Sequence, residues 1–372
     1  MAFEEISRNT TIPTVGGKKI DDAVVVSTIN GTVFNGWKSV SITKNIDTMA
    51  HGFSMEIFDS FLPLKKNWPL KPGVKVKISI GKERVITGFI DVLDIGFDAT
   101  SRTFTVSGRS APSDLIDCSH VGDTEFTNIS LEELAKQLVA PFGLKVFLSV
   151  VPETIDKFAI KPGETVFEAL DRAARLQGFF WISTRGGNIR LTRAARVRAF
   201  SQIAQGFNLT GASLSIDNSA RFSEYSVKGQ SAGGDEIPGL TAAQPEGSAK
   251  DGGITRFRPL LIIAEGAVDT AKATKRAQWE MSNRIAQGFQ VSATVDSWLQ
   301  EDGSLWGINQ LVRFNSQFIG VKSNLLIAGI EQTKSFSGGT STNFTLVPKN
   351  SFDPQPEANA GGDELLEQLG AT

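Results

Sequence analysis

The side chains best suited to acid–base or nucleophilic chemistry are scarce in this sequence. Its 372 residues include two histidines, His51 and His120, and one cysteine, Cys118. These numbers exclude a Cys-rich zinc site, a His-rich metal centre and an intramolecular disulfide. Histidine is the usual general base near neutral pH, and no G-x-S-x-G motif suggests a serine triad. We therefore expect two ordinary surface or turn histidines, a small buried cysteine side chain, and no enzymatic activity.

Carboxylates are the remaining candidates for catalysis. Asp114, Asp117 and Asp123 cluster around Cys118, and Asp94 and Asp98 precede them. A pair of carboxylates could hydrolyse a glycosidic bond, but scattered loop aspartates usually serve turns and solvation. EF-hand spacing, a P-loop and a G-x-G-x-x-G motif before a helix are all missing. The sequence predicts no metal and no cofactor, and a cell-wall hydrolase is its weakest alternative.

The charge balance argues against a dedicated nucleic-acid binder. Lys and Arg total 38 against 40 Asp and Glu, for a net charge of -2, whereas nucleic-acid binders are normally strongly basic. The arginines between Arg185 and Arg198 are therefore expected on an ordinary exposed face. No apolar run reaches the length of about 20 residues that spans a bilayer, and the N-terminus is not typical of a signal peptide. We expect no membrane insertion by this chain.

One segment suggests carbohydrate binding. The run from Phe158 through Lys161-Pro162-Gly163-Glu164-Thr165-Val166 resembles the opening of a LysM peptidoglycan-binding module. That module has two helices before its second strand, whereas here one helix leads directly to Gly178. The same residues also form a good turn followed by a helix cap. Peptidoglycan binding therefore stays an alternative function.

The first third of the chain has the alternation of half-buried strands. Apolar and polar residues alternate over residues 37–43, 74–80 and 102–108, and this period of two indicates antiparallel strands with one solvated face. Turn residues separate these strands at Pro72-Gly73 and Gly81-Lys82. We expect an N-terminal segment over residues 1–19 and a tube-like β-barrel over residues 20–112.

Helical signals begin in the middle of the chain. Ser130 with Glu133 and Thr165 with Glu168 form two capping boxes, each followed by an apolar helical face. A hairpin should then turn around Arg185-Gly186-Gly187. Residues 118–203 are predicted as an α+β domain with short helices, inserted between β regions.

The last third returns to strands, over residues 212–216 and 224–228. We expect a second tube-like β-barrel over residues 205–348, with a flexible loop at 231–253 and a helix at 268–287. A flexible tail over residues 349–372 should become ordered only on contact with a partner. The apolar side chains of the tail that would make this contact are Leu365, Leu366 and Leu369.

An internal repeat links the two predicted barrels. Short matches recur in the same order: residues 50–53 with 286–289, 59–62 with 296–299, 86–91 with 327–331, and 104–106 with 344–346. A duplicated β-domain is the inference, in which Gly88 and Gly329 should occupy equivalent backbone positions; two unrelated β-domains of similar composition are the alternative. The predicted core residues of the two barrels are Trp37, Phe53, Phe89 and Phe104 in the first, and Phe289, Trp298, Ile327 and Phe344 in the second.

Several ordered segments resemble one family. These are residues 34–42, Gly108-Arg109-Ser110 through Cys118, residues 131–143, residues 164–170 and the helix around residues 276–281. In this combination the chain is similar to the Mu-type tail protein P family, the baseplate hub proteins of contractile-tailed phages, with relatives in type VI secretion spikes. The loop around Pro245 and the C-terminal tail are not matched.

The resemblance implies a structural hub in place of an enzyme. A hub of this family is a homotrimer whose two barrels per chain form a quasi-six-fold ring, which joins a hexameric tail tube to a trimeric spike around a channel for DNA. The implied partners are further copies of this chain, the tube protein, the spike, other baseplate subunits and a tape measure protein, without sequence-specific nucleic-acid binding. The implied location is the tail baseplate of the virion, assembled in the host cytoplasm.

Overall fold

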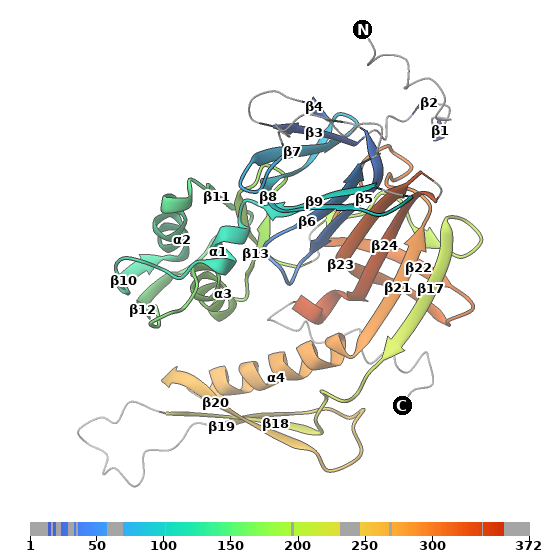
Figure 1. The fold of residues 1–372 in the computed structure, drawn as a ribbon. Coiled ribbons are helices and arrows are strands. Elements are labelled where there is room, and N and C mark those ends of the chain that lie inside the picture. The colour runs from blue at the N-terminus through green and yellow to red at the C-terminus, as the bar shows by residue number, and fades with distance from the viewer. Residues whose placement is uncertain are drawn as a thin grey trace, which may run out of the picture.

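The computed structural model describes residues 14–15, 18–19, 24–28, 33–34, 36–57, 70–100, 102–194, 197–230, 246–267, 270–336 and 338–352. The chain is mainly β, as predicted. A large sheet forms the centre, a unit of short helices lies beside it, and a long helix with a small sheet lies below (Figure 1). The predicted contacts Leu365, Leu366 and Leu369 lie outside the described residues.

Fourteen strands make the central sheet. Those of the first half are β3 (Val24–Thr28), β4 (Val33–Phe34), β5 (Trp37–Asn45), β6 (Gly52–Ile57), β7 (Lys75–Ile80), β8 (Glu83–Phe97) and β9 (Arg102–Ser110). Those of the second half are β15 (Val197–Arg198), β16 (Ile203–Ala204), β17 (Leu209–Ile216), β21 (Phe289–Val295), β22 (Gln310–Ser316), β23 (Val321–Ser335) and β24 (Gly339–Pro348). A separate two-stranded ribbon, β1 (Thr14–Val15) and β2 (Lys18–Lys19), precedes them.

The two halves share one strand order. The first runs β5-β6-β9-β8-β7 and the second β17-β21-β24-β23-β22, with antiparallel pairing at every step. The duplication predicted from sequence is thus present as topology. The halves are not two separate barrels, however, because β5 pairs with β23 and merges them into one sheet. Among the described strands that sheet runs from β17 to β4 without a pairing that closes it.

Alternation builds a core on one face of each half. On β6 and β9 every second residue is buried, and the intervening positions carry mostly Ser, Thr, Glu or Arg. The first half packs around Ile42, Met55 and Ile78, and the second around Val291, Phe314 and Leu346. The opposite face of the sheet therefore stays polar, which is the arrangement expected of an antiparallel sheet with one wet side.

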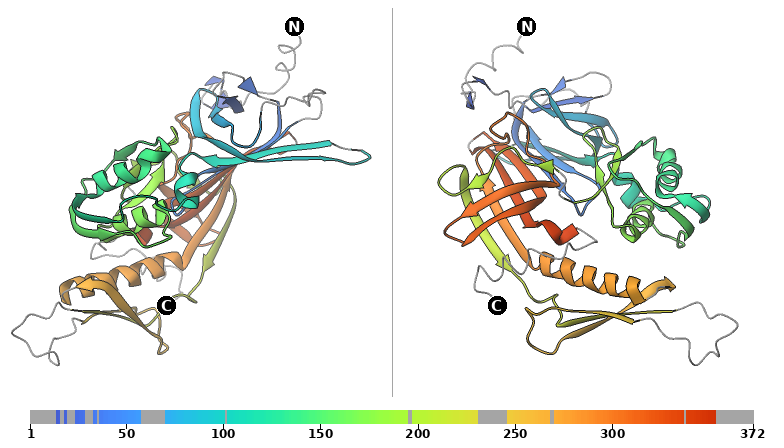
Figure 2. Two further views of the ribbon diagram at one scale, coloured as in Figure 1. Left: turned by 60° about the vertical axis from the view of Figure 1, so that its left-hand side comes forward. Right: turned by 180° about the vertical axis from the view of Figure 1, so that it is seen from behind.

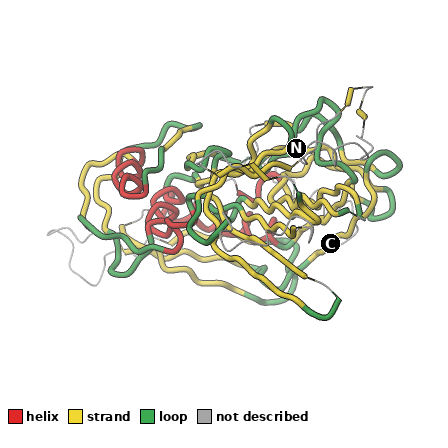
Figure 3. Tube along the Cα trace, turned by 45° about the horizontal axis from the view of Figure 1, so that its top comes forward, coloured by secondary structure: helices red, strands yellow, loops and turns green. Residues whose placement is uncertain are grey.

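The α+β unit follows β9. Its elements are α1 (Ser113–Asp117), β10 (Glu125–Ser130), α2 (Leu131–Val139), a 3₁₀ helix (Ala140–Phe142), β11 (Val146–Leu148), β12 (Thr154–Ala159), α3 (Val166–Leu176), β13 (Phe180–Ser183) and β14 (Ile189–Thr192). Both predicted capping boxes are confirmed, with reciprocal bonds between Ser130 and Glu133 and between Thr165 and Glu168. The predicted hairpin is the antiparallel pair β13–β14. α2 and α3 lie to one side of the central strands (Figure 1), and Figure 3 also shows helices, in red, on that side of the molecule.

A second small unit interrupts the second half between β17 and β21. It consists of β18 (Glu224–Gln230), β19 (Glu246–Lys250), β20 (Pro259–Ala267) and α4 (Thr270–Gln287). The helix packs on the sheet through Tyr225, Val227 and Ala277, and Figure 2 shows this unit extending below the main sheet. The prediction of a loop over 231–253 was wrong for residues 246–250, which pair with β18. Residues 231–245 lie outside the described part of the chain.

Candidate assembly interface

The predicted core residues separate into three groups. Phe53 and Phe104 are buried in the first core, with Trp37 partly buried against it. Phe289, Ile327 and Phe344 are buried in the second core. Phe89 is half-buried, and the ammonium of Lys75 lies 5.6 Å from its ring centroid. The structure thus places five of these side chains in the core that the sequence assigned to them, with Trp37 at the margin of the first core.

Trp298 is placed differently from the sequence assignment. It is fully buried, but in the core of the first half, together with Leu305. Its indole Nε1 donates to the carbonyl oxygens of Thr333 and Ser341, 2.9 Å from each. Trp298 therefore ties the β23–β24 hairpin of the second half to the core of the first, a long-range contact that local alternation does not encode.

The two glycines expected to be equivalent are offset in the ladders. In the β8–β9 pair the extra, bulged residue is Asp91, and Gly88 lies before it. In the β23–β24 pair the bulged residue is Ala328, and Gly329 directly follows it. The repeat therefore holds for strand order, while this pair of matched segments is out of register.

The junction between the halves is a seven-residue ladder. It runs from Asn45 opposite Gly329 to Ser39 opposite Ser335. On the core side Ile42 and Gln332 face each other, and both are fully buried. Side-chain bonds reinforce the ladder, since Ser41 Oγ donates to Glu331 Oε1 and Lys44 Nζ donates to Gln332 Oε1, both at 3.2 Å.

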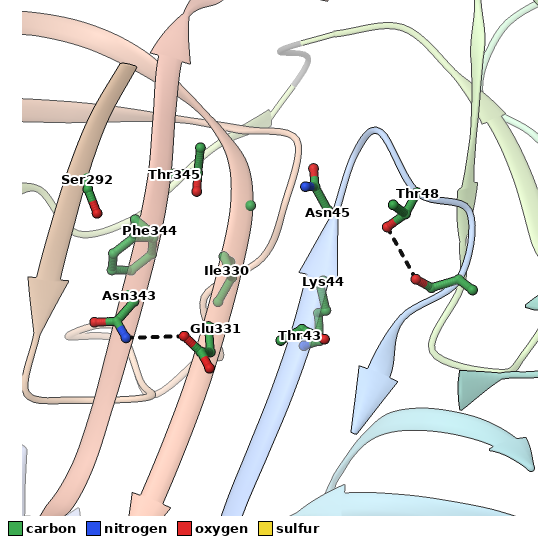
Figure 4. Close-up of a pocket in the computed structure, with 12 residues that line it drawn as sticks. Thr43, Lys44, Asn45, Thr48, Ser292, Ile330, Glu331, Asn343, Phe344 and Thr345 are labelled. Atoms are coloured by element: carbon green, nitrogen blue, oxygen red, sulfur yellow. Dashed lines mark hydrogen bonds between the residues drawn. The ribbon is translucent and has the colours of Figure 1, made fainter. Parts of the chain in front are cut away.

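A shallow hollow of about 390 Å³ lies on the polar face beside this junction. Figure 4 shows Thr43 and Asn45 of β5 across from Glu331, whose carboxylate accepts a bond from the Asn343 side chain. Most of the lining side chains are hydroxyl or amide, with one carboxylate and the apolar Ile330 and Phe344, whereas small-molecule sites are mostly apolar. We interpret this hollow as a surface feature of the β5–β23 junction and not as a small-molecule site.

Two basic groups lie at the same junction, where His51 is buried and Lys44 is half-buried. Burial, and secondarily the charge of Arg185, lowers the pKa of Lys44 to about 7. Burial and the neighbouring Lys44 charge lower the pKa of His51 to about 3, which keeps the imidazole neutral. The expectation of an exposed or turn histidine was wrong for His51, because its backbone N–H and carbonyl both bond to Ser110 and draw it under β9. His120 does occupy a surface turn, with Nε2 2.8 Å from the Asp123 carbonyl.

The remaining titratable candidates serve local structure. Arg109 donates to Asp91 and to both oxygens of Asp117, and that bonding lowers the pKa of Asp117 and raises that of Arg109. Cys118 is exposed, contrary to prediction, because it caps α1 with its backbone and projects its thiol outward. In the described part of the chain no group of three His, Cys, Asp or Glu residues has the spacing to hold a metal ion.

The LysM-like segment is used within the α+β unit. Phe158 is buried, and the guanidinium of Arg172 lies 4.4 Å from its ring centroid. Arg172 also binds both carboxylate oxygens of Glu164, while Thr165 caps α3. Glu164 and Thr165 thus bond to other residues of the α+β unit and contribute to its structure.

The sequence interpretation missed the most exposed apolar residues of the sheet. Beyond the bulge at Asp91, β8 and β9 extend as a hairpin past the body of the molecule (Figure 2). Ile95 and Phe97 on this extension are 68% and 87% exposed. The signal was present in the chain, because Leu93, Ile95 and Phe97 continue the alternation of a strand beyond the range assigned to the core.

Family models match three stretches of the chain. Residues 24–110 match the N-terminal domain of Mu phage baseplate assembly protein GpP-like proteins, and residues 112–193 match the second domain of gp44-like baseplate hub proteins. Residues 269–355 match the fourth domain of Mu phage baseplate assembly protein GpP. Baseplate hub protein gp44 of Escherichia phage Mu is 33% identical over 333 residues, which is 87% of each chain.

Solved structures of tail proteins have a similar fold. The 43 kDa tail protein of prophage MuSo2 from Shewanella oneidensis has a TM-score of 0.79 and 30% identity, covering 88% of this chain and 99% of that one. A tail protein from Neisseria meningitidis MC58 has a TM-score of 0.78 and 24% identity, covering 89% and 98%. The E. coli type VI secretion component c3393 shares the fold, with a TM-score of 0.54 and 8% identity over 89% of this chain and 79% of that one. Among the described helices, none has the length and hydropathy needed to cross a bilayer.

Proposed function

This chain belongs to the family of Mu-like phage baseplate hub proteins, and from that premise we propose that it is the structural hub subunit of a contractile phage tail or tailocin. Three copies form a ring in which the two halves of each chain act as successive, similar sectors. The ring joins a hexameric tail tube on one face to a trimeric spike on the other. In this proposal the tube-like β-structure predicted for each half is completed when three copies assemble into the ring.

The observation that carries the proposal is the repeated strand order together with the internal junction. Each half has the order found in the other, and β5 and β23 join them edge to edge within one chain. A contact that joins one sector to the next can recur between chains, and a heterologous contact that recurs closes into a ring when its rotation allows. Three chains of two sectors supply six similar units, which can match a six-fold tube, while the whole keeps three-fold symmetry for the spike.

The polar face of the sheet supports a channel for DNA. Its side chains near the junction are Ser39, Ser41, Thr43, Asn45, Ser54, Ser107, Ser292, Thr294, Asn343 and Thr345. Two cations on this face are neutralised, since Lys38 pairs with Glu56 and Arg109 with Asp91 and Asp117. A wall of hydroxyls and paired charges would bind phosphates weakly and let DNA pass.

The proposal also covers location and partners. The subunit resides in the virion baseplate after assembly in the host cytoplasm, and contacts the tube protein, the spike, other baseplate subunits and the tape measure protein. It performs no catalysis and takes no cofactor. Its domains are those expected from sequence, with residues 20–112 and 205–348 as the ring sectors and 118–203 outside the ring, except that β15 and β16, which pair with β22, join the second sector.

The test is the mass of the purified protein in solution. Light scattering across a concentration series should give three times 40.1 kDa, and negative-stain images should show rings with three-fold symmetry. A monomer at every concentration, both alone and co-expressed with its spike protein, would overturn the proposal.

A further inference from the structure

The junction between the halves covers one edge of β5, whereas the corresponding edge of β17 in the second half is left open among the described strands. On β5 the core-side residues Val40 and Ile42 are 4% and 0% exposed, because the end of β23 pairs along that edge. The equivalent strand of the second half, β17, pairs with β21 on one side. Among the described strands its other edge has no ladder, and Ile216 on its core side is 38% exposed.

The matching open edge lies at the far end of β8. Residues 83–89 of β8 pair with β7, as residues 321–326 of β23 pair with β22. Beyond them, residues 329–335 of β23 pair with β5, whereas residues 92–97 of β8 have β9 alone among the described strands. Leu93, Ile95 and Phe97 therefore line an apolar edge that extends past the body of the molecule (Figure 2).

The bulges fix which residues of the two long strands correspond. Val92 comes directly after the bulged Asp91, just as Gly329 comes directly after the bulged Ala328. Counting from there, Leu93, Ile95 and Phe97 correspond respectively to Ile330, Gln332 and Lys334.

The ladders fix the correspondence of the two edge strands in the same way. Ile42 faces Phe53, which faces Gly108, which faces Ile90 just before the first bulge. Leu214 faces Val291, which faces Leu346, which faces Ile327 just before the second bulge. Ile42 therefore corresponds to Leu214, and by the same count Lys44 corresponds to Ile216 and Val40 to Ala212.

We propose that β17 of one copy of this chain pairs antiparallel with residues 92–97 of β8 in a second copy, in the register of the internal junction. Ile42 faces Gln332 inside the chain, so Leu214 faces Ile95 between chains. Ile216 then faces Leu93 and Ala212 faces Phe97. This inference rests on the proposed hub function and names the residues by which the ring closes.

The sequence of the two edges fits this register and disfavours others. All three core-side pairs are apolar, and on the polar face Ser215 meets Asp94 and Ser213 meets Gly96. A shift by one residue would place serines against Ile95 and Phe97 and expose the leucine and isoleucine of β17. The internal junction has the polar residues Gln332 and Lys334 at the positions that Ile95 and Phe97 occupy in the proposed junction. The proposed junction is therefore the more apolar of the two, which suits a contact that must bind a separate chain.

Engineered disulfides test the register directly. In a Cys118→Ser background, Ser215→Cys with Asp94→Cys places two thiols on residues predicted to lie opposite each other. Their Cβ atoms should be about 4.5–5.5 Å apart, within the reach of a disulfide after small adjustment. The matched control is Ser213→Cys with Asp94→Cys, shifted by two residues. All three sites are exposed, so the fold should tolerate both pairs.

Mild oxidation with copper phenanthroline in dilute solution should link the first pair into trimers on a non-reducing gel, and leave the control pair largely unlinked. A trimer by light scattering without this cross-link, or with the control cross-link favoured, would overturn the junction while leaving the hub proposal standing. A monomer without cross-links would overturn both the junction and self-assembly of the ring.

A charge on the open edge gives an independent readout. Phe97→Asp should raise the dissociation constant of the trimer by about tenfold or more, because the carboxylate would be buried without a partner. The control is Phe257→Asp, at a residue that is 90% exposed on the small unit around α4, which should leave the trimer intact. Equal effects of the two variants, or an unchanged trimer with Phe97→Asp, would contradict the proposed contact.

Discussion

The two β-rich halves share five strands in the same order but finish their long hairpins differently. β8 and β23 are both 15 residues long, and each continues past a bulge beyond its own core. The β23–β24 extension lies against β5 of the other half and bonds Trp298, whose side chain is buried in the core of that half, and Gln332 is fully buried. The β8–β9 extension leaves Ile95 and Phe97 exposed. A duplicated fold can therefore carry one junction already made and a second one open for another chain.

The halves also differ in the connection that leaves their edge strand. In the first, residues 46–51 connect β5 directly to β6. In the second, the same connection holds the small unit of β18, β19, β20 and α4, with its own core. A connection on the outer edge of a sheet tolerates such an insertion because it interrupts no ladder within the repeat.

The largest effect should come from breaking the buried ion pair of that small unit. Arg221 and Asp251 are 2% and 1% exposed and make two bonds of 2.8 and 2.9 Å. Asp251→Ala leaves a buried guanidinium without its partner and should destabilise the unit by about 3–5 kcal/mol. Amide exchange at Tyr225 and Val227 should accelerate, while Val291 in the main sheet stays protected.

The control for this variant is Glu246→Ala. The Lys228–Glu246 pair lies in the same small sheet, but it is exposed and 3.8 Å long, so its loss should cost about 0.5 kcal/mol or less. Simultaneous loss of protection in β18 and β21 after Asp251→Ala would mean that the insertion and the second half unfold as one unit.

The next effect separates the two glycines that the repeat suggested were equivalent. A Cβ on Gly88 would overlap the backbone of Arg109 and Ser110, whereas one on Gly329 would lie 3.3 Å from the side chain of Thr345. Gly88→Ala should therefore lower the free energy of unfolding by about 3 kcal/mol, and Gly329→Ala by about 1 kcal/mol or less. Urea denaturation of both variants measures the difference, and equal losses would contradict the offset between the ladders.

A smaller effect distinguishes the two buried tryptophans. Trp298 Nε1 bonds two carbonyls of the β23–β24 hairpin, whereas Trp306 Nε1, in the second core, has no partner among the described residues. Tryptophan to phenylalanine removes the same volume at both sites. Trp298→Phe should therefore cost about 1–3 kcal/mol more than Trp306→Phe, because it alone leaves hydrogen-bond acceptors unsatisfied. A larger loss with Trp306→Phe would assign the greater role to packing.

Local signals in the sequence were sufficient for most elements. The capping boxes at Ser130 and Thr165 mark the starts of α2 and α3 correctly, since each box is closed within four residues of chain. The strands around residues 37–43, 74–80 and 102–108 are predicted by alternation, and the duplication by the order of short matches. These features depend on neighbours in sequence, which a single chain displays directly.

Register and long-range burial could not be predicted in the same way. Alternation in the sequence does not show where a bulge adds a residue to one strand, so the segments around Gly88 and Gly329 match in sequence although the ladders place Gly329 at the position of Val92. His51 and Trp298 are buried by strands distant in sequence, and Cys118 is exposed because its backbone caps a short helix. The boundaries of the domains and the tail contacts at Leu365, Leu366 and Leu369 stay predictions.

The smallest effect concerns Lys44, which occupies in β5 the position that Ile216 occupies in β17. Its pKa is lowered from 10.5 to about 7, first by burial and then by Arg185. Between those two values the unfolded chain binds more protons than the folded one, so stability rises with pH across this window. His51 titrates below it, because its pKa is lowered to about 3 from 6.5.

Replacing Lys44 with isoleucine gives the internal junction the residue that Ile216 supplies in the proposed junction between chains. Lys44→Ile should stabilise the protein by about 1 kcal/mol near pH 7, a modest figure because the side chain is half-buried and water screens part of the charge penalty. The gain should shrink toward zero as the pH approaches 10.5, where the unfolded lysine also loses its proton. Lys77→Ile, at an exposed site on β7, should show no such slope. Thermal melts from about pH 7 to 10 compare the two variants, and a pH-independent gain from Lys44→Ile would mean that packing, and not the buried charge, sets the difference between the junctions.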